Sequence, residues 1–591
     1  SEHLERLHRI RDLAGLSPVR PSSAADFFQR WREDAPNFAR WVGELYLERH
    51  QGTLTTQAAV KRGNRKMEKA LRELEMLALI VECQLGRPYP RQDLQAWWEE
   101  TLLYQFHDIL PGSSIKRVYD ECIPRYEQML SQVKAQIKKC LEALAAHVDS
   151  GNIIEPVLVF NSLPWARTES IRTAAGVVSV SVPSCGYAVV SGQPTSAHPA
   201  LKASPTSLEN DCILASFDDG GRLTRLVHKQ SDRQILAPES VGNDLVMFPD
   251  LGDAWDFPMD YHDLPTQHLR RIHAEARVEG DRAILEQRFE FGHSWLTQRI
   301  VLTAGSPRLD FHCQAQWRET STMLRVRFPV DVRAQEASYD LQIGHLFRPT
   351  HGNTTWDLAR DEVAAHHWAD LSTSTHGVAL LNDCKYGHRV KDHTLDLNLI
   401  RSVPHPGPRR IEDDQVQPGE PHGHYTDQRD HTFTYALWPH EGDVVEGGVD
   451  RAGHELNSPV QWVAAPTGPG SAPSSGTSVP GLSWLRIETE DGDAGGDRGA
   501  TGTHTSASGA AGGAIILEAV KKAEEGDDWI VRLCEANGRA VTVSLYIDLP
   551  VAGIEQVDLM EQSLESLQVE APLRLDFTPF ELKSLRLRLA T

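Results

Sequence analysis

A histidine and an aspartate, His107 and Asp108, stand next to each other where a helical pattern ends. Large apolar residues recur at helical spacing up to Phe106, and Asp93 is a plausible N-cap, which predicts a helix that ends at Asp108. One member of such a pair can bind a metal ion while the other reaches a ligand beside it. The spacing alone is more typical of a surface pair or a satisfied helix cap, because one histidine carries no metal-ligand pattern of its own.

A second group that could do chemistry lies in the segment 252–256, where Asp253 and Asp256 flank Trp255. Carboxylates accept hydrogen bonds from sugar hydroxyls, and an indole can pack on the apolar face of a pyranose ring. The pattern therefore suits sugar recognition, although the spacing alone favours a polar turn that is anchored by its tryptophan.

The segment 366–371 contains His366, His367 and Asp370, which would suggest a metal site. Their spacing matches no helical metal motif, and turn residues interrupt the neighbouring segments. A structural role is favoured for these side chains.

The composition bounds the class of protein. The chain has 591 residues, which is too long for one hydrophobic core, and its formal net charge of −22 argues against a nucleic-acid or anionic-membrane surface. No apolar run is long enough to span a bilayer. The eight cysteines are scattered without a C-x-x-C pair, so we expect buried thiols in a reducing compartment and a cytoplasmic protein.

Three predicted helices, each with an apolar stripe, are expected to position His107 and Asp108. The first covers 61–85, with Lys61, Arg65 and Glu68 on its polar side; the second ends at Asp108; the third covers about 118–148, although Pro124 suggests a start near that residue. Three such stripes joined by short loops predict an antiparallel three-helix bundle.

After Gly151 the hydrophobic period changes to two, which is typical of half-buried antiparallel strands. The clearest cases are 308–318 and the run in which Leu324, Val326 and Phe328 alternate with Arg325 and Arg327. The fold class is therefore multidomain α + β, a three-helix bundle followed by large antiparallel β-sandwich (supersandwich) domains. The segments 404–429, 466–480 and 491–513 read as long loops or disordered insertions.

The segment 105–113, Gln-Phe-His-Asp-Ile-Leu-Pro-Gly-Ser, resembles the signature of the glycoside hydrolase family 38 α-mannosidases of the bacterial and cytosolic type. The resemblance continues through 43–57, 253–256, 348–371 and 379–387. It implies that 1–55 is a remnant of the end of the catalytic α/β barrel and that 56–149 is the family's middle domain. It further implies a β-sandwich or supersandwich at 150–450 and a terminal β-sandwich at 451–591, with a disordered insertion near 466–513.

By this resemblance His107 is a zinc ligand, and Asp108 contacts the bound sugar. Asp253, Trp255 and Asp256 are expected close to the same sugar. The family hydrolyses mannose-containing oligosaccharides with retention, using one carboxylate as nucleophile and another as acid. The nucleophile and the other zinc ligands are expected outside this chain, so we expect the chain alone to be inactive, with exposed apolar surface and a tendency to self-associate as a homo-oligomer.

Two alternatives remain open at this point. The chain could be a stand-alone carbohydrate-binding or scaffold protein derived from the family. It could also be another sandwich-bearing sugar enzyme of the aldose epimerase type, which would need a His/Glu pair on facing strands that no sequence feature singles out.

Overall fold

The computed structural model describes residues 2–148, 150–404, 424–467, 478–489 and 515–590. The chain divides into two compact units, Ser1–Leu47 and Glu48–Thr591. The first unit holds α1 (Glu2–Ile10), α2 (Ala24–Asp34) and the 3-10 turn η1 (Ala35–Asn37), and none of these elements has a buried residue. The rings of Phe27, Phe28, Trp31 and Phe38 contact one another but stay about half exposed.

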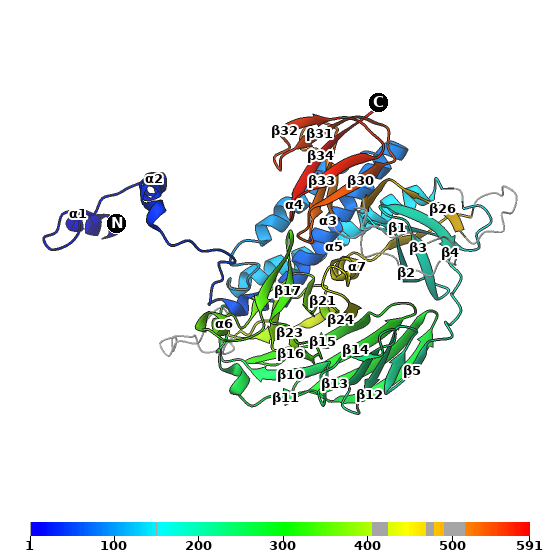
Figure 1. The fold of residues 1–591 in the computed structure, drawn as a ribbon, viewed down its shortest axis with the longest axis horizontal. Coiled ribbons are helices and arrows are strands. Elements are labelled where there is room, and N and C mark those ends of the chain that lie inside the picture. Colours follow the sequence, from blue (N-terminus) through cyan, green and yellow to red (C-terminus); the bar gives the residue numbers. More distant parts are fainter. Residues whose placement is uncertain (1, 149, 405–423, 468–477, 490–514, 591) are drawn as a thin grey trace. The chain divides into compact units, whose positions relative to one another are not determined.

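The second unit begins with a turn and three long helices, which lie together in Figure 1. These are η2 (Gln51–Leu54), α3 (Ala58–Leu85), α4 (Arg91–Tyr104) and α5 (Lys116–Ala145). The predicted bundle is confirmed, with α3 packed against both α4 and α5. Pro124 lies inside α5 and does not mark its start.

The predicted polar side of α3 is wrong at two positions. Lys61 and Arg65 are 4% and 1% exposed, because this face of the helix packs on the β domains. The Arg65 guanidinium donates to the carbonyl oxygen of His366 and to Asn457 Oδ1, and it lies 4.6 Å above the ring of Tyr386. Arg65 therefore lies in the interface between α3 and the β domains and does not face solvent.

Two antiparallel sheets form the large β domain, with strands in the orders β12-β13-β14-β15-β24-β21-β20-β17-β18 and β11-β10-β16-β23-β22-β19. Their bounds are β10 (Asp244–Pro249), β11 (Gln267–His268), β12 (Arg271–Glu279), β13 (Arg282–Phe291), β14 (Ser294–Thr303), β15 (Leu309–Gln316), β16 (Thr322–Pro329), β17 (Glu336–Leu341), β18 (Gly344–Pro349), β19 (Val363–Ala364), β20 (Trp368–Ser372), β21 (His376–Asn382), β22 (Gly387–Lys391), β23 (Thr394–Ser402) and β24 (Asp430–Glu441). The turn η3 (Tyr261–Asp263) and the helices α6 (Thr355–Ala359) and α7 (Val449–Asn457) lie in or after this domain.

Smaller sheets flank this domain along the chain. One has the order β25-β1-β4-β26, with β2-β3 beside it in sequence, and another runs β5-β6-β7-β8-β9. The bounds are β1 (Pro156–Asn161), β2 (Arg167–Arg172), β3 (Val177–Val182), β4 (Gly186–Ser191), β5 (Lys202–Ser204), β6 (Ser207–Glu209), β7 (Ile213–Phe217), β8 (Leu223–His228), β9 (Arg233–Gln234), β25 (Gln461–Ala464) and β26 (Ser478–Ser483).

The C-terminal sheets have the orders β27-β30-β33 and β28-β29-β34-β31-β32. They comprise β27 (Leu485–Thr489), β28 (Ile515–Lys522), β29 (Trp529–Glu535), β30 (Val541–Ile547), β31 (Val551–Val557), β32 (Ser563–Leu567), β33 (Leu573–Phe577) and β34 (Leu582–Leu589). Apolar residues of α3, α4 and α5 form one core cluster with Leu517 and Trp529 of these sheets. The helices and the C-terminal strands therefore share a core rather than folding as separate bodies.

The strand prediction at 308–318 is confirmed by β15, whose residues Phe311, Cys313 and Ala315 are buried. In β16 the prediction is wrong for Arg325, which is completely buried and pairs with Glu362 at 2.7 Å and Asp396 at 2.6 Å. Most of the expected insertions at 404–429, 466–480 and 491–513 lies outside the described residues. None of the described helices is both long and apolar enough to cross a bilayer.

Candidate functional site

The loop that carries His107 follows α4 directly. The helix ends at Tyr104, so the expectation that His107 and Asp108 lie on its last turn is wrong; both residues lie in turns beyond it. The side chain of His107 is 81% exposed and that of Asp108 is 43% exposed. The imidazole Nε2 lies 3.6 Å from Asp108 Oδ2. Because the His107 side chain is so exposed, a ligand outside this loop can reach the ring.

The backbone of this loop is held by hydrogen bonds on several sides. Tyr119 of α5 donates its hydroxyl to the carbonyl oxygen of Asp108 at 2.9 Å and accepts the backbone N–H of Ser114 at 2.9 Å. Ser113 Oγ donates to Asp108 Oδ1 at 2.8 Å. The loop is therefore fixed in position while its imidazole remains accessible.

The segment 252–256 forms a polar turn in which both carboxylates accept backbone hydrogen bonds. Asp253 Oδ1 accepts the N–H groups of Trp255 at 2.9 Å and Asp256 at 3.0 Å. Asp256 Oδ1 accepts the N–H of His50, and its other oxygen lies 3.8 Å from Arg49. Trp255 is half-buried. The Asp253 carboxylate thus closes the turn and the Asp256 carboxylate links it to His50, while their direct contact with a sugar stays a prediction.

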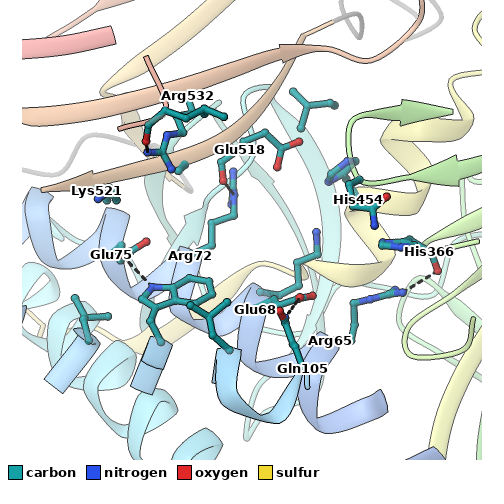
Figure 2. A pocket seen from close by; sticks show the side chains of 18 of the residues that line it. Arg65, Glu68, Arg72, Glu75, Gln105, His366, His454, Glu518, Lys521 and Arg532 are labelled. Atoms are coloured by element: carbon teal, nitrogen blue, oxygen red, sulfur yellow. Dashed lines mark hydrogen bonds between the residues drawn. The ribbon is translucent and has the colours of Figure 1, made fainter. Parts of the chain in front are cut away.

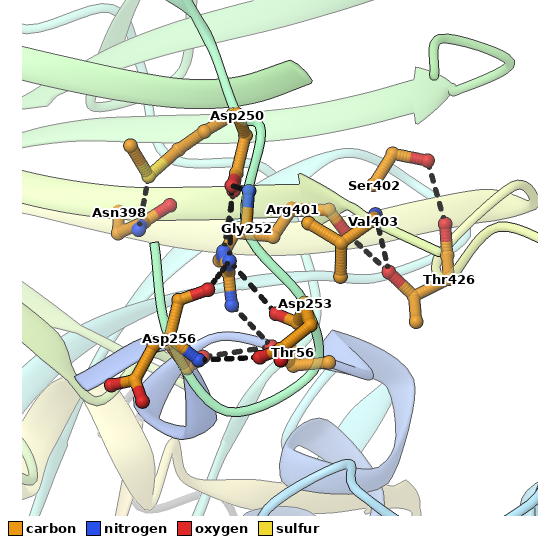
Figure 3. A network of polar contacts seen from close by, with 12 residues as sticks. Thr56, Asp250, Gly252, Asp253, Asp256, Asn398, Arg401, Ser402, Val403 and Thr426 are labelled. Carbon is orange, nitrogen blue, oxygen red and sulfur yellow. Dashed lines mark hydrogen bonds and ion pairs between the residues drawn. The ribbon is translucent and has the colours of Figure 1, made fainter. Parts of the chain in front are cut away.

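Arg401, on β23, holds this turn through hydrogen bonds (Figure 3). Its guanidinium donates to both oxygens of Asp250, at 2.6 and 3.1 Å, and to the carbonyl oxygens of Asp253 and Asp256, each at 3.1 Å. Nη1 donates to Thr56 Oγ1 at 2.8 Å. Arg401 and Asp250 are both 0% exposed, so the pair is a rigid internal anchor.

The two loops converge on Thr56, between η2 and α3. Thr56 Oγ1 lies 3.0 Å from the carbonyl oxygen of Ala254, in the second loop. The carbonyl oxygen of Thr56 accepts from Lys61 Nζ at 2.6 Å, and the same ammonium donates to the carbonyl of Leu110 at 2.8 Å, in the first loop. Among the described residues, however, no hydrogen bond or ion pair joins His107 or Asp108 directly to Asp253, Trp255 or Asp256.

Two buried ionisable residues lie at this junction, Lys61, which the sequence placed on a polar helix face, and Asp427, which it did not single out. Asp427 accepts the N–H groups of Gln57 and Ala58, each at 2.9 Å, and thereby caps α3. Burial raises the pKa of Asp427 to about 6 and lowers the pKa of Lys61 to about 7. Asp427 lies in a stretch that the sequence pattern marks as loop, so no periodic signal could have found it.

The donor set of the described residues does not fit a complete zinc site. Zinc needs four ligands in a tetrahedron, and His107 supplies one imidazole. No group of three or more His, Cys, Asp or Glu side chains in the described ranges could hold a metal ion. The structural role of the other histidine segment is supported, because His367 Nδ1 hydrogen-bonds to Asp340 Oδ2 at 2.7 Å in the interior.

Comparison with known families matches three parts of the chain. Residues 48–144 match the alpha mannosidase middle domain, residues 208–409 match the glycosyl hydrolases family 38 C-terminal domain, and residues 514–585 match the glycosyl hydrolases family 38 C-terminal beta sandwich domain. The match to the middle domain begins at Glu48, the first residue of the second structural unit.

Known relatives align with nearly the whole chain. Human alpha-mannosidase 2C1 is 35% identical over 99% of this chain, and alpha-mannosidase G of Dictyostelium discoideum is 29% identical over 99%. The chain spans about half the length of these relatives, 54% and 56%. The crystal structure of an alpha-mannosidase from Enterococcus faecalis shares the fold, with a TM-score of 0.76 and 16% identity over 99% of this chain and 74% of that one.

Proposed function

Because the chain belongs to glycoside hydrolase family 38, we propose that it forms part of a retaining α-mannosidase that hydrolyses terminal α-mannosides of oligosaccharides. The observation that carries the proposal is the arrangement of His107. Its imidazole is 81% exposed, on a loop whose backbone is held by Tyr119 and Lys61. A fixed loop with an accessible ring suits a ligand that is shared with another part of the protein. The epimerase-type alternative is not favoured by the family.

In this proposal His107 contributes one ligand to a zinc site, and the remaining ligands come from the portion of the relatives that this sequence does not span. A zinc ion bound there would act as a Lewis acid toward sugar oxygens. Asp108 is half exposed beside the imidazole and is placed to accept a hydrogen bond from a sugar hydroxyl. Trp255 is the most plausible sugar contact of the second loop, because both neighbouring carboxylates already accept backbone N–H groups.

The surface beside His107 supports this shared site. Leu102, Leu103, Phe106 and Ile115 are 57%, 62%, 51% and 60% exposed, and they lie within the same short stretch of chain. Neighbouring apolar side chains on a surface mark a place where another folded part packs. Phe106, whose ring centroid lies 4.2 Å from that of His107, is the apolar side chain placed to exclude water from such a site.

The first test is an assay of the purified 591-residue chain with p-nitrophenyl α-mannoside. We expect no turnover, because the described residues offer one zinc ligand and no identified nucleophile. Turnover that persists after host mannosidase has been removed would contradict this division of the site. If a longer protein that contains this chain binds mannosides without hydrolysing them, the chain would instead belong to a carbohydrate-binding protein.

The second test examines His107 in a longer protein that contains this chain, if the reading frame continues upstream of Ser1. The His107→Ala variant should lose bound zinc and most of its activity. The matched control is His293→Ala, because His293 is also exposed but lies in the turn between β13 and β14. Retention of zinc and full activity by His107→Ala would remove His107 from the site.

A cytoplasmic location is part of the same proposal. Cys185, Cys313 and Cys384 are buried, and burial raises the pKa of each thiol to about 12. Such thiols are unreactive and suit a reducing compartment.

A further inference from the structure

A cavity of about 930 Å³ lies where α3 and α4 meet α7 and the C-terminal strands. Figure 2 shows Arg72 extending from α3 to the backbone of Glu518 on β28, where Nε donates to the Glu518 carbonyl oxygen at 3.1 Å, with His454 on another wall. The cavity touches Gln105 at one edge, but His107, Asp108 and the 252–256 turn do not line it. It is therefore a separate feature from the candidate functional site, and its volume is in the range of small-ligand cavities.

Several polar groups that line this cavity have unused hydrogen-bonding capacity. Lys69 and the Glu518 carboxylate make no hydrogen bond or ion pair within the described ranges, although they lie close enough to influence each other's charge. Arg72 Nη1 and His367 Nε2 are buried without a partner among those residues. His367 is 9% exposed, and its other ring nitrogen is already bonded to Asp340. Lys69 and Glu518 are partly exposed and line the cavity, so their ammonium and carboxylate groups can meet the hydroxyl groups of a polar ligand.

The burial of these groups is reflected in their proton affinities. Burial lowers the pKa of Lys69 to about 8 and raises the pKa of Glu518. Burial also raises the pKa of Glu75 to about 7, and Glu75 accepts a hydrogen bond from the indole of Trp98 at 3.1 Å. Groups of both charges thus line one cavity, with neither sign in clear excess.

The acidic and basic side chains that line the cavity together indicate which class of ligand it can bind. An anion would meet Arg72 and Lys69 but also the carboxylates of Glu518 and Glu75, and the described residues hold no cluster that could bind a metal cation. A sugar hydroxyl both donates and accepts, so it satisfies a carboxylate and an ammonium at once. Trp98 adds an aromatic ring to the wall. We propose that this cavity binds a short neutral oligosaccharide, separately from the hydrolytic site.

The test is isothermal titration of the purified full chain with α-linked mannotriose, and with inorganic phosphate as the anionic probe. We expect saturable binding of the trisaccharide and none of phosphate. Lys69→Gln and Glu518→Gln should each weaken binding by about tenfold or more, since each removes one charge-assisted hydrogen bond. Weaker binding by both variants would assign the trisaccharide to this cavity, because Lys69 and Glu518 line it and neither belongs to the candidate functional site. Lys138→Gln is the surface control, because Lys138 on α5 is 69% exposed.

Three results would overturn the proposal: no saturable binding of the trisaccharide, phosphate binding that is lost in Lys69→Gln, or equal trisaccharide binding by all variants. Thermal melting of each variant checks folding. If a variant does not fold, saturation-transfer NMR of the unchanged chain with the trisaccharide decides whether an aromatic wall is contacted. The test involves no hydrolysis, so it can succeed where the mannosidase proposal fails.

Discussion

Arg401 and Asp250 form an ion pair in which guanidinium Nε and Nη2 donate to the two carboxylate oxygens, at 2.6 and 3.1 Å, and neither side chain is exposed. Asp250 directly follows β10 and Arg401 lies on β23. Since the same guanidinium also bonds Thr56, this pair joins the β domain to the start of the helices.

Replacing Arg401 with methionine should destabilise the chain severely. The change leaves the buried carboxylate of Asp250 without its partner, which costs about 3–5 kcal/mol of unfolding free energy. Denaturant titration measures the change. The control is Arg117→Met on α5, where an exposed arginine pairs with Glu121 one helical turn away, and little change is expected there. Similar midpoints for the two variants would show that the Asp250 pair is not an anchor.

Lys61→Met should loosen the loop that carries His107. Lys61 Nζ donates to the buried carbonyl oxygen of Thr56 and to the partly buried carbonyl oxygens of Leu110 and Pro111, and without it these acceptors lose their donor. The expected cost is about 1–3 kcal/mol. Hydrogen exchange followed by mass spectrometry should show faster exchange in peptides that cover 105–114. The control is Lys138→Met, at an exposed position. If Lys61→Met exchanges hydrogen in 105–114 no faster than this control, the Lys61 bonds do not hold the loop.

Periodicity predicted the elements of the fold well, because burial on one face leaves a repeating pattern. The apolar stripe of α3 and the alternation of β15 were readable for this reason. The exceptions are charged residues that are buried by partners distant in sequence. Arg325 is neutralised by Glu362 and Asp396, and no local pattern announces such a pairing.

The candidate site was only partly predictable for a related reason. The family signature identified the loop of His107 and the turn of Trp255, but their common support on Thr56 depends on contacts across about two hundred residues of sequence. The end of α4 was placed four residues too late, because Phe106 continues the apolar spacing although the chain has already turned. The charged cavity had no sequence signal, since its walls come from helices and strands that lie far apart in the sequence.

The buried pair of His440 and Asp370 should make stability depend on pH. Burial lowers the pKa of His440, but the Asp370 carboxylate, 2.9 Å from Nε2, outweighs this and raises the pKa overall above its ordinary value. The folded state therefore holds the proton more tightly than the unfolded state. The stabilisation is fully present below the unfolded pKa of about 6.5 and is lost as the pH rises through the folded pKa.

Chemical denaturation of the unchanged chain and of His440→Gln, at about pH 6 and about pH 8, measures this effect. The unchanged chain should lose more unfolding free energy between the two pH values than the variant does. His293→Gln, at an exposed position, should behave like the unchanged chain. Parallel pH dependence in all three proteins would assign the effect to other groups.

Gly52→Ala should disturb the junction between the helices and the β domain. A Cβ atom at Gly52 would overlap Nη1 of Arg401 and would lie 2.9 Å from the carbonyl oxygen of Trp255. The Arg401 guanidinium is held at Asp250 and Thr56 and cannot move aside without breaking those bonds, so a loss of about 1–3 kcal/mol is expected. The matched control is Gly553→Ala, where the nearest atom to an added Cβ is 3.8 Å away.

Because the Trp255 turn packs on Gly52, the Gly52→Ala variant should also change the tryptophan fluorescence of the folded chain. Unfolding midpoints that match between Gly52→Ala and Gly553→Ala would show that the junction tolerates expansion and that Arg401 is not rigidly held.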